Sequence, residues 1–83
     1  MRIVNSLGLH ARPAAAFVKI ASRHASQISV RKDDMEVNGK SIMGMMMLAA
    51  ECGSELRVRA EGDDAESAVQ ELVSLVQGGF GED

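Results

Sequence analysis

Residues 8–15 read Gly8-Leu9-His10-Ala11-Arg12-Pro13-Ala14-Ala15 and hold an imidazole, a guanidinium and the start of an alanine-rich helical run. Proline is well tolerated at the first position of a helix, where its missing N–H would bond nothing in any case. His10 is therefore expected at, or just before, a helix N-terminus. Such a terminus offers N–H groups and the positive end of the helix dipole to an anion. A nucleophilic imidazole beside that anion site is what reversible phosphorylation of a histidine requires.

His10 and Arg12 are the candidate reactive pair of this segment. Histidine titrates near neutral pH, so its neutral, nucleophilic form is available under physiological conditions. The planar guanidinium of Arg12 matches the oxygens of a phosphoryl group. A plainer interpretation makes His10 a helix cap or a surface residue. The order of residues across the whole segment is hard to explain by packing alone, which favours the phosphoryl site.

The flanking segments alternate between strand and helix patterns. Apolar residues recur at helical spacing or in alternation, and Gly, Asn and Asp mark the breaks. The expected elements are a strand at 2–5, a helix at 13–23, strands at 27–32 and 35–37, a helix capped by Ser41 and running through Met47, a strand at 56–61, and a helix from about 65 that Gly78 and Gly79 end. This order indicates an α+β fold with helices on one face of an antiparallel sheet.

Composition excludes several classes of function. The chain has 83 residues, of which 46% are hydrophobic, and a net charge of −3. Two Phe residues are the only aromatic ones, so stacking on nucleobases is not expected, and the acidic balance argues against nucleic acid as a partner. One cysteine cannot form an internal disulfide. With no signal peptide or membrane-length apolar run, we expect a cytoplasmic protein without a membrane partner.

The segment around His10 resembles the active-centre signature of HPr, the histidine-containing phosphocarrier of the bacterial phosphotransferase system. A second stretch, Lys40-Ser41-Ile42-Met43-Gly44, resembles the HPr segment around its regulatory serine. The resemblance extends to the last helix and to the tail Gly79-Phe80-Gly81-Glu82, and so covers nearly the whole chain.

The resemblance implies an open-faced sandwich of four antiparallel strands and three helices, as one domain spanning residues 1–83. Because the chain begins later than typical members, its first strand is expected to be short. His10 would accept a phosphoryl group on its δ nitrogen from enzyme I and pass it to an enzyme IIA domain, with Arg12 stabilising the group in transit. The chain would be a monomeric carrier with no cofactor or metal, and not an enzyme.

Ser41 allows two interpretations that are compatible. Serine is a preferred helix N-cap and needs no further reason to stand there. The resemblance implies that Ser41 is also the target of a bifunctional HPr kinase/phosphorylase. The tripeptide Gly39-Lys40-Ser41 imitates the end of a nucleotide-binding P-loop, but the full pattern needs glycine where Asp34 stands, so ATP binding is rejected.

The helix after Ser41 is rich in methionine. By helical spacing Ile42, Met43 and Met46 share one side, and the resemblance places that side next to the active histidine as a docking surface for partners. Lys19, two turns along the first helix from Arg12, could help to meet an acidic partner.

The remaining histidine and the cysteine are expected to have bland roles. His24 is expected at a solvated helix end, and Cys52 as a small buried residue near a turn.

Two other functions stay open at this point. One is a nitrogen-related regulatory paralogue of the same family, to which the stretch Met46-Met47-Leu48-Ala49-Ala50 gives some weight. The other is a small ligand-binding regulatory domain of α+β type, which would need no reactive histidine.

Overall fold

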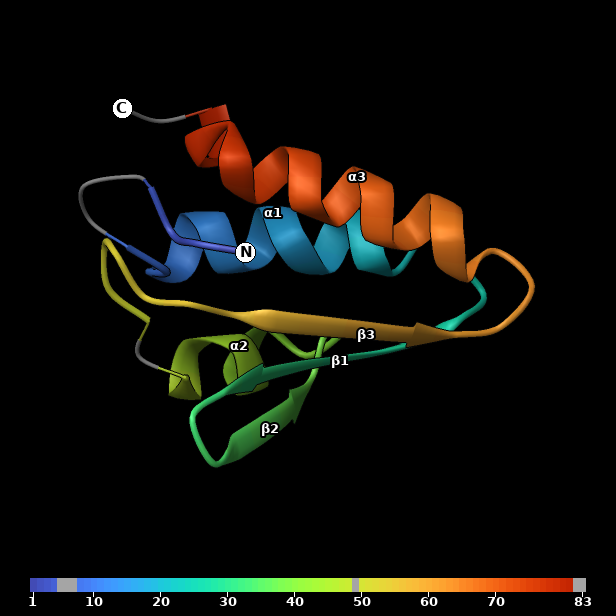
Figure 1. Cartoon of the computed structure of the whole chain (residues 1–83), viewed down its shortest axis with the longest axis horizontal. Helices are drawn as coiled ribbons and strands as arrows, with labels where there is room; N and C mark the ends of the chain where they lie inside the picture. Colours follow the sequence, from blue (N-terminus) through green and yellow to red (C-terminus); the bar gives the residue numbers. More distant parts are fainter. Residues whose placement is uncertain (5–7, 49, 82–83) are drawn as a thin grey trace.

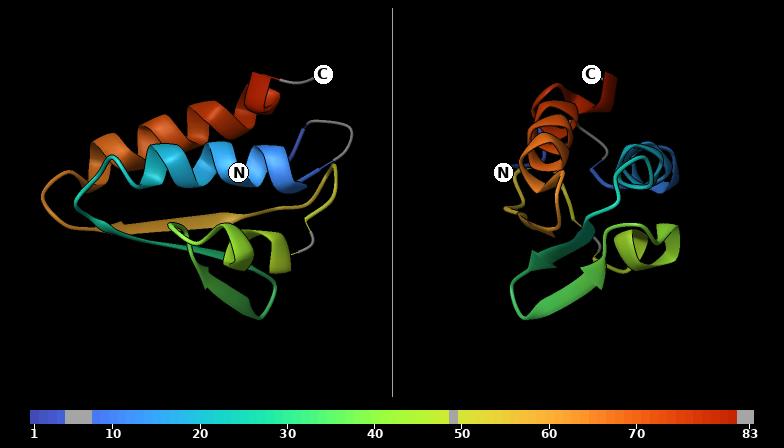
Figure 2. Two further views of the ribbon diagram at one scale, coloured as in Figure 1. Left: turned by 180° about the vertical axis from the view of Figure 1, so that it is seen from behind. Right: turned by 90° about the vertical axis from the view of Figure 1, so that its right-hand side faces the viewer.

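The computed structural model describes residues 1–4, 8–48 and 50–81 and has two layers, helices and a sheet. Figures 1 and 2 show α1 and α3 side by side over one face of the sheet, while no described helix covers the opposite face. The elements are α1 (Ala11–Ala21), β1 (Gln27–Lys32), β2 (Met35–Asn38), α2 (Ile42–Met47), β3 (Arg57–Glu61), α3 (Ala65–Gln77) and a short 3-10 turn η1 (Gly79–Gly81). The expected α+β class and open face are thus confirmed.

The sheet is antiparallel, with strand order β2-β1-β3. Val30 at its centre is paired with Val37 on one side and Val58 on the other. Burial alternates along β1, where Ile28 and Val30 face the helices and are buried. This alternation is the period of two that the sequence predicted.

The expected strand at residues 2–5 differs from the structure. Within the described residues it is reduced to a single antiparallel bridge between Arg2 and Glu55, and Asn5 lies outside those residues. The Ile3 N–H donates to the Ser54 carbonyl at 2.9 Å, and Ile3 is 1% exposed. Gly53, with a φ of 92°, bends the partner chain just before it. Pairing with a turn instead of a straight strand explains why the described sheet has three strands and not four.

Helix α1 begins two residues earlier than the proline suggested. Pro13 is its third residue, not its first. Because no N–H in the first turn has an acceptor within the helix, proline fits there as well. The stripe expected along this helix is confirmed, since Ala14, Phe17 and Ala21 are all 0% exposed.

Helix α3 supplies the other half of the core. Ala68, Leu72 and Val76, spaced four residues apart, are 0% exposed and point at α1 and the sheet. Val69 and Val73, next to these residues on the helix, are half-buried at the edge of the same face. The helix ends where expected, at Gly78, followed by Gly79 in a left-handed conformation with φ of 68°.

A polar clamp made by His24, Ser26 and Asp64 joins the loop after α1 to the start of α3. Asp64 accepts hydrogen bonds from the N–H groups of Ala25 and Ser26 at 2.9 and 3.0 Å, and also from the Ser26 hydroxyl. The Nδ1 atom of His24 lies 3.2 Å from the same carboxylate. A Cβ on Gly62 would stand 2.6 Å from the Ser26 hydroxyl oxygen, so glycine is required there.

The prediction that His24 is a solvated helix end is wrong. The side chain is 9% exposed, with Nε2 3.3 Å from Glu71 of α3. Its burial arises from Asp64 and Glu71, which are far away in the sequence, so no local pattern reveals it.

Candidate functional site

His10 stands at the N-cap of α1, half-buried, where the sequence placed it. Its side chain makes no capping hydrogen bond to the helix, which argues against a role as a side-chain cap. The Ala14 N–H already donates to the His10 carbonyl at 3.0 Å, and Pro13 has no N–H. The N–H groups of Ala11 and Arg12 are the remaining donors of the first turn, and they have no acceptor within the helix.

Gly8 and Leu9 set the position of this terminus. The Leu9 N–H donates to the Ala50 carbonyl at 2.8 Å, and the Leu9 side chain is buried. Gly8 has a φ of 71°, and a Cβ there would stand 2.6 Å from the Ala50 carbonyl oxygen and 2.9 Å from Glu51 Cα. A residue with a side chain would therefore push the loop off its neighbour. Glycine thus keeps His10 close to the chain that leaves α2.

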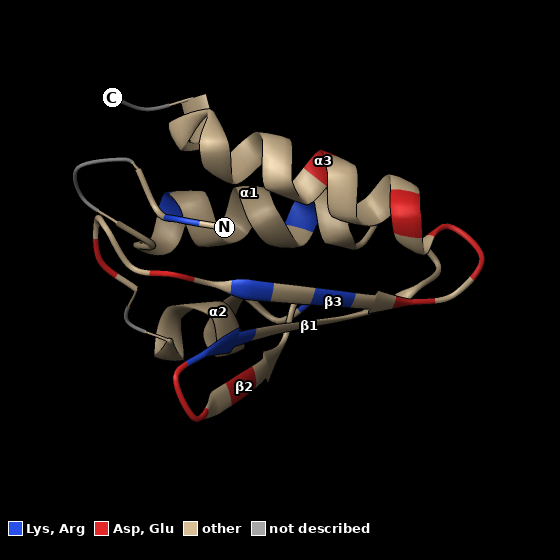
Figure 3. Cartoon of the chain, viewed as in Figure 1, with Lys and Arg blue, Asp and Glu red and all other residues tan. Residues whose placement is uncertain are grey.

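Arg12 is exposed on the first turn of α1, two residues from His10. Among the described residues its guanidinium has no ion pair. The side chain is therefore available to an anion bound at this helix end, where the dipole acts in the same sense. Lys19 is exposed in the last turn of the same helix. Figure 3 shows basic residues on α1 and on β1 and β3, with acidic ones around the β1–β2 turn and the start of α3.

Ser41 caps α2, as the sequence predicted. Its hydroxyl oxygen accepts a hydrogen bond from the Gly44 N–H at 3.0 Å, and its side chain is half-buried. Two lysines fix the ends of this helix. The Nζ atom of Lys40 donates to the His24 carbonyl at 2.7 Å, and that of Lys32 to the Leu48 carbonyl at 3.2 Å.

Helix α2 presents an apolar surface to solvent, which we call the methionine face. In Figures 1 and 2 the helix lies beside the N-terminal half of α1, and the two pack together. The face consists of Ile42, Met43, Met46 and Met47, which are 46, 75, 45 and 62% exposed. Met45, on the opposite side, is 0% exposed. The sequence predicted the first three on one side of the helix, and Met47 joins them in the structure.

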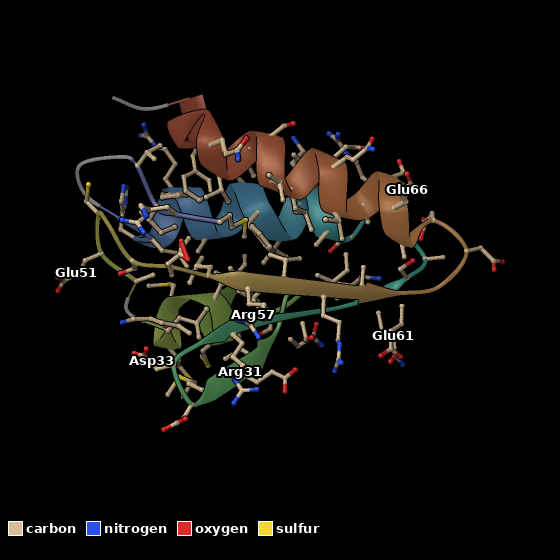
Figure 4. The ribbon with its side chains drawn as sticks, in the orientation of Figure 1. Arg31, Asp33, Glu51, Arg57, Glu61 and Glu66 are labelled. Carbon is tan, nitrogen blue, oxygen red and sulfur yellow. The ribbon has the colours of Figure 1, made fainter. Side chains whose placement is uncertain are left out.

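The predicted site is a surface, not an enclosed pocket. Figure 4 shows Arg31 and Arg57 on neighbouring strands of the open sheet face, where they line a shallow hollow with Asp33 and Glu55. That hollow includes none of the predicted site residues.

Cys52, expected to be buried, is exposed in the turn after α2. Within residues 1–4, 8–48 and 50–81, no cluster of residues could hold a metal ion, and no helix is long and apolar enough to cross a membrane.

Comparison with known proteins shows the family to which this chain belongs. The family model for the PTS HPr component phosphorylation site matches residues 1–78. The chain belongs to the HPr family. It is 46% identical to phosphocarrier protein HPr of Neisseria meningitidis over 82 residues, which cover 99% of this chain and 92% of that protein. HPr of Treponema pallidum is 47% identical over 83 residues, covering 100% and 94%.

Solved HPr structures share this fold. The crystal structure of HPr from Thermoanaerobacter tengcongensis has a TM-score of 0.95 and 52% identity, and the match covers 100% of this chain and 93% of that one. The family model and these relatives confirm the resemblance inferred from the two motifs. HPr is a phosphocarrier of the phosphotransferase system and not an enzyme. The HPr-like protein Crh of Bacillus subtilis, whose solution structure is described as that of the catabolite repression HPr, is similar as well. It is 47% identical over 70 residues, which cover 84% of this chain and 82% of that protein.

Proposed function

We propose that this chain accepts a phosphoryl group on His10 from enzyme I and passes it to an enzyme IIA domain, in the cytoplasm and as a monomer. The observation that carries the proposal is the position of His10 at the N-cap of α1, with a side chain that does not cap the helix. The neutral imidazole attacks the phosphorus of the phosphorylated donor through its δ nitrogen. One P–N bond forms as the bond to the donor breaks, and phosphoenolpyruvate is the ultimate source of the group.

The surroundings of His10 favour the phosphorylated state. The N–H groups of the first turn and the exposed guanidinium of Arg12 are hydrogen-bond donors for the phosphoryl oxygens. These donors hold the group without burying it, so the next acceptor can approach from solvent. An open site suits a carrier because its partners must reach the same phosphorus atom in turn.

Partner proteins bind the methionine face of α2, which lies next to α1. We assign docking to Ile42, Met43 and Met46 of the methionine face, which are all at least 45% exposed. Exposed apolar patches on small proteins mark contact surfaces. Lys19 adds a positive charge for an acidic partner. Met43→Glu, at the most exposed of these positions, is expected to raise the KM of enzyme I for this carrier about 5- to 30-fold, as loss of an interface hot spot does, with an unchanged circular dichroism spectrum.

The direct test is labelling with radioactive phosphoenolpyruvate and enzyme I. Wild type should acquire an acid-labile, base-stable phosphoryl group, and His10→Ala should not. His24→Gln is the control, with folding checked by thermal melting because His24 is buried against Asp64 and Glu71. Equal labelling of His10→Ala would disprove the assignment.

Ser41 is proposed as a regulatory phosphorylation site for an HPr kinase/phosphorylase. Its hydroxyl oxygen already accepts from the Gly44 N–H, and a phosphoryl ester at an N-cap keeps acceptor oxygens in that place. The modification therefore adds negative charge beside the docking surface, while α2 stays folded.

A regulatory role, including the nitrogen-related branch, is the second candidate. The stretch Met46-Met47-Leu48-Ala49-Ala50 gives weight to the nitrogen-related branch, and the similarity to the HPr-like protein Crh supports a regulatory role in general. Presenting the phosphorylated chain to sugar-specific and to nitrogen-related enzyme IIA domains separates the two roles. Rapid transfer to sugar-specific domains supports transport, whereas transfer confined to nitrogen-related domains supports the second candidate.

A further inference from the structure

The methionine residues of α2 differ sharply in exposure within six residues. Met43 is 75% exposed, Met47 62% and Met46 45%, whereas Met45 is 0% exposed. Three methionine residues thus reach solvent on the same helix, and one is enclosed. On β2, Met35 is 44% exposed, almost the same as Met46, but it lies on a different element.

Exposed thioethers react with hydroperoxides. The O–O bond of the peroxide breaks and one oxygen forms a bond to sulfur, so that the sulfur loses two electrons and the peroxide gains them. The rest of the peroxide leaves as water when it is hydrogen peroxide, or as an alcohol when it is an organic hydroperoxide. The product, methionine sulfoxide, is polar and chiral, and it disrupts methionine-rich interfaces. Because Met45 is enclosed, oxidation of the exposed sulfurs leaves the packing of α2 on the core unchanged.

We propose that Met43, Met46 and Met47 form an oxidation site on the methionine face, where hydroperoxide converts the thioethers to sulfoxides and weakens the binding of enzyme I. The effect on binding rests on the docking role proposed above. The reacting groups of α1, His10 and Arg12, contain no sulfur, so the modification acts on association and leaves phosphoryl transfer itself intact. Methionine sulfoxide reductase with a dithiol, which becomes a disulfide as water is released, reverses the change.

The first experiment measures where oxidation occurs. Every variant carries Cys52→Ser, since Cys52 is exposed and its thiol reacts with peroxide as well. Folded protein is treated with hydrogen peroxide, and fragment-ion mass spectrometry follows each methionine. Met43, Met46, Met47 and Met35 should gain oxygen while Met45 stays reduced. Oxidation of Met45 at the rate of its neighbours would overturn the proposal.

The second experiment measures transfer after the peroxide has been removed with catalase. The oxidised protein should show a KM with enzyme I raised at least about fivefold, with kcat within about twofold, because an interface contact is lost and not a reacting group. Reductase treatment should restore the original KM. A variant with Met43→Leu, Met46→Leu and Met47→Leu keeps an apolar face of similar volume and should resist peroxide, whereas Met35→Leu should remain sensitive. The proposal would be overturned if peroxide raised the KM of the triple variant as much as that of the parent protein. It would also be overturned if Met35→Leu alone prevented the rise in KM.

Met43→Glu separates this proposal from the docking assignment. A raised KM in Met43→Glu together with an unchanged KM after oxidation would refute the oxidation site and leave docking in place. An unchanged KM in both would refute docking through this face, and the oxidation effect with it.

Discussion

Arg12 is exposed and has no ion pair among the described residues, so its side chain contributes little to folding. If it contacts the phosphoryl oxygens, Arg12→Lys removes the planar fork and leaves the charge. A charge-assisted hydrogen bond contributes about 1.5–3 kcal/mol, so phosphoryl transfer should slow about 10- to 100-fold. Rapid-quench kinetics with enzyme I measure this rate.

Thermal melting supplies the control for that variant. An exposed substitution away from caps and the core changes stability by about 0.5 kcal/mol or less, so the melting temperature should barely move. Unchanged transfer in Arg12→Lys would remove Arg12 from the site. A large fall in melting temperature would instead assign it a structural role.

Single residues were predictable from the sequence where their environment is local. His10 and Ser41 were placed correctly because an N-cap depends on the few residues that follow it. The environment of His24 is not local, because its partners Asp64 and Glu71 stand at the N-cap and in the middle of α3. Cys52 was misjudged for a related reason, since the turn that exposes it is shaped by pairing with the N-terminal residues.

Elements followed the sequence closely, and their departures have local causes. The bounds of β1 were predicted to the residue, because alternation and flanking turn residues agree there. The start of α1 was placed too late because proline is accepted throughout the first turn. The strand at 2–5 reduces to a bridge because its partner, around Gly53, is bent.

Helix α2 is the element on which regulation is proposed, and Ser41→Asp tests it. The carboxylate can cap the helix as serine does, but its charge should repel an acidic partner surface. We expect an affinity for enzyme I that is at least about fivefold lower at low salt, with part of the loss relieved at high salt. Isothermal titration at both salt concentrations measures this.

Ser41→Asn is the matched control, because asparagine is an equally good N-cap and has no charge. It should bind enzyme I as wild type does. If Ser41→Asn and Ser41→Asp weakened binding equally, the cause would be shape and not charge. If neither changed the affinity, Ser41 would be a helix cap without an electrostatic role in docking.

At the scale of the whole molecule, the clamp around Asp64 connects the two helices that cover the sheet. The Ser26 hydroxyl, the N–H groups of Ala25 and Ser26, and His24 hold the pKa of Asp64 well below its ordinary value of 3.8, against the opposing effect of burial. Lys40 extends the connection, because its ammonium donates to the His24 carbonyl and Ser41 follows it directly. The clamp therefore anchors the C-terminal end of α1, whose other end carries His10, and through Lys40 also the start of α2.

The lowered pKa makes a prediction about acid stability. Since the folded pKa lies below the unfolded one, unfolding takes up a proton in acid, and the ionised form of Asp64 stabilises the fold above the unfolded value. This contribution is complete above about pH 5 and is lost as the pH falls below 3.8 towards the folded pKa.

Asp64→Asn keeps an acceptor oxygen but has no charge, so it should melt several degrees below wild type at neutral pH. Differential scanning calorimetry from pH 7 to pH 2 should show the gap constant down to about pH 5 and narrower below it. His24→Gln should leave that pattern in place, because the Ser26 and Ala25 donors remain. A gap that stays constant to pH 2 would show that Asp64 acts through its shape and not its charge.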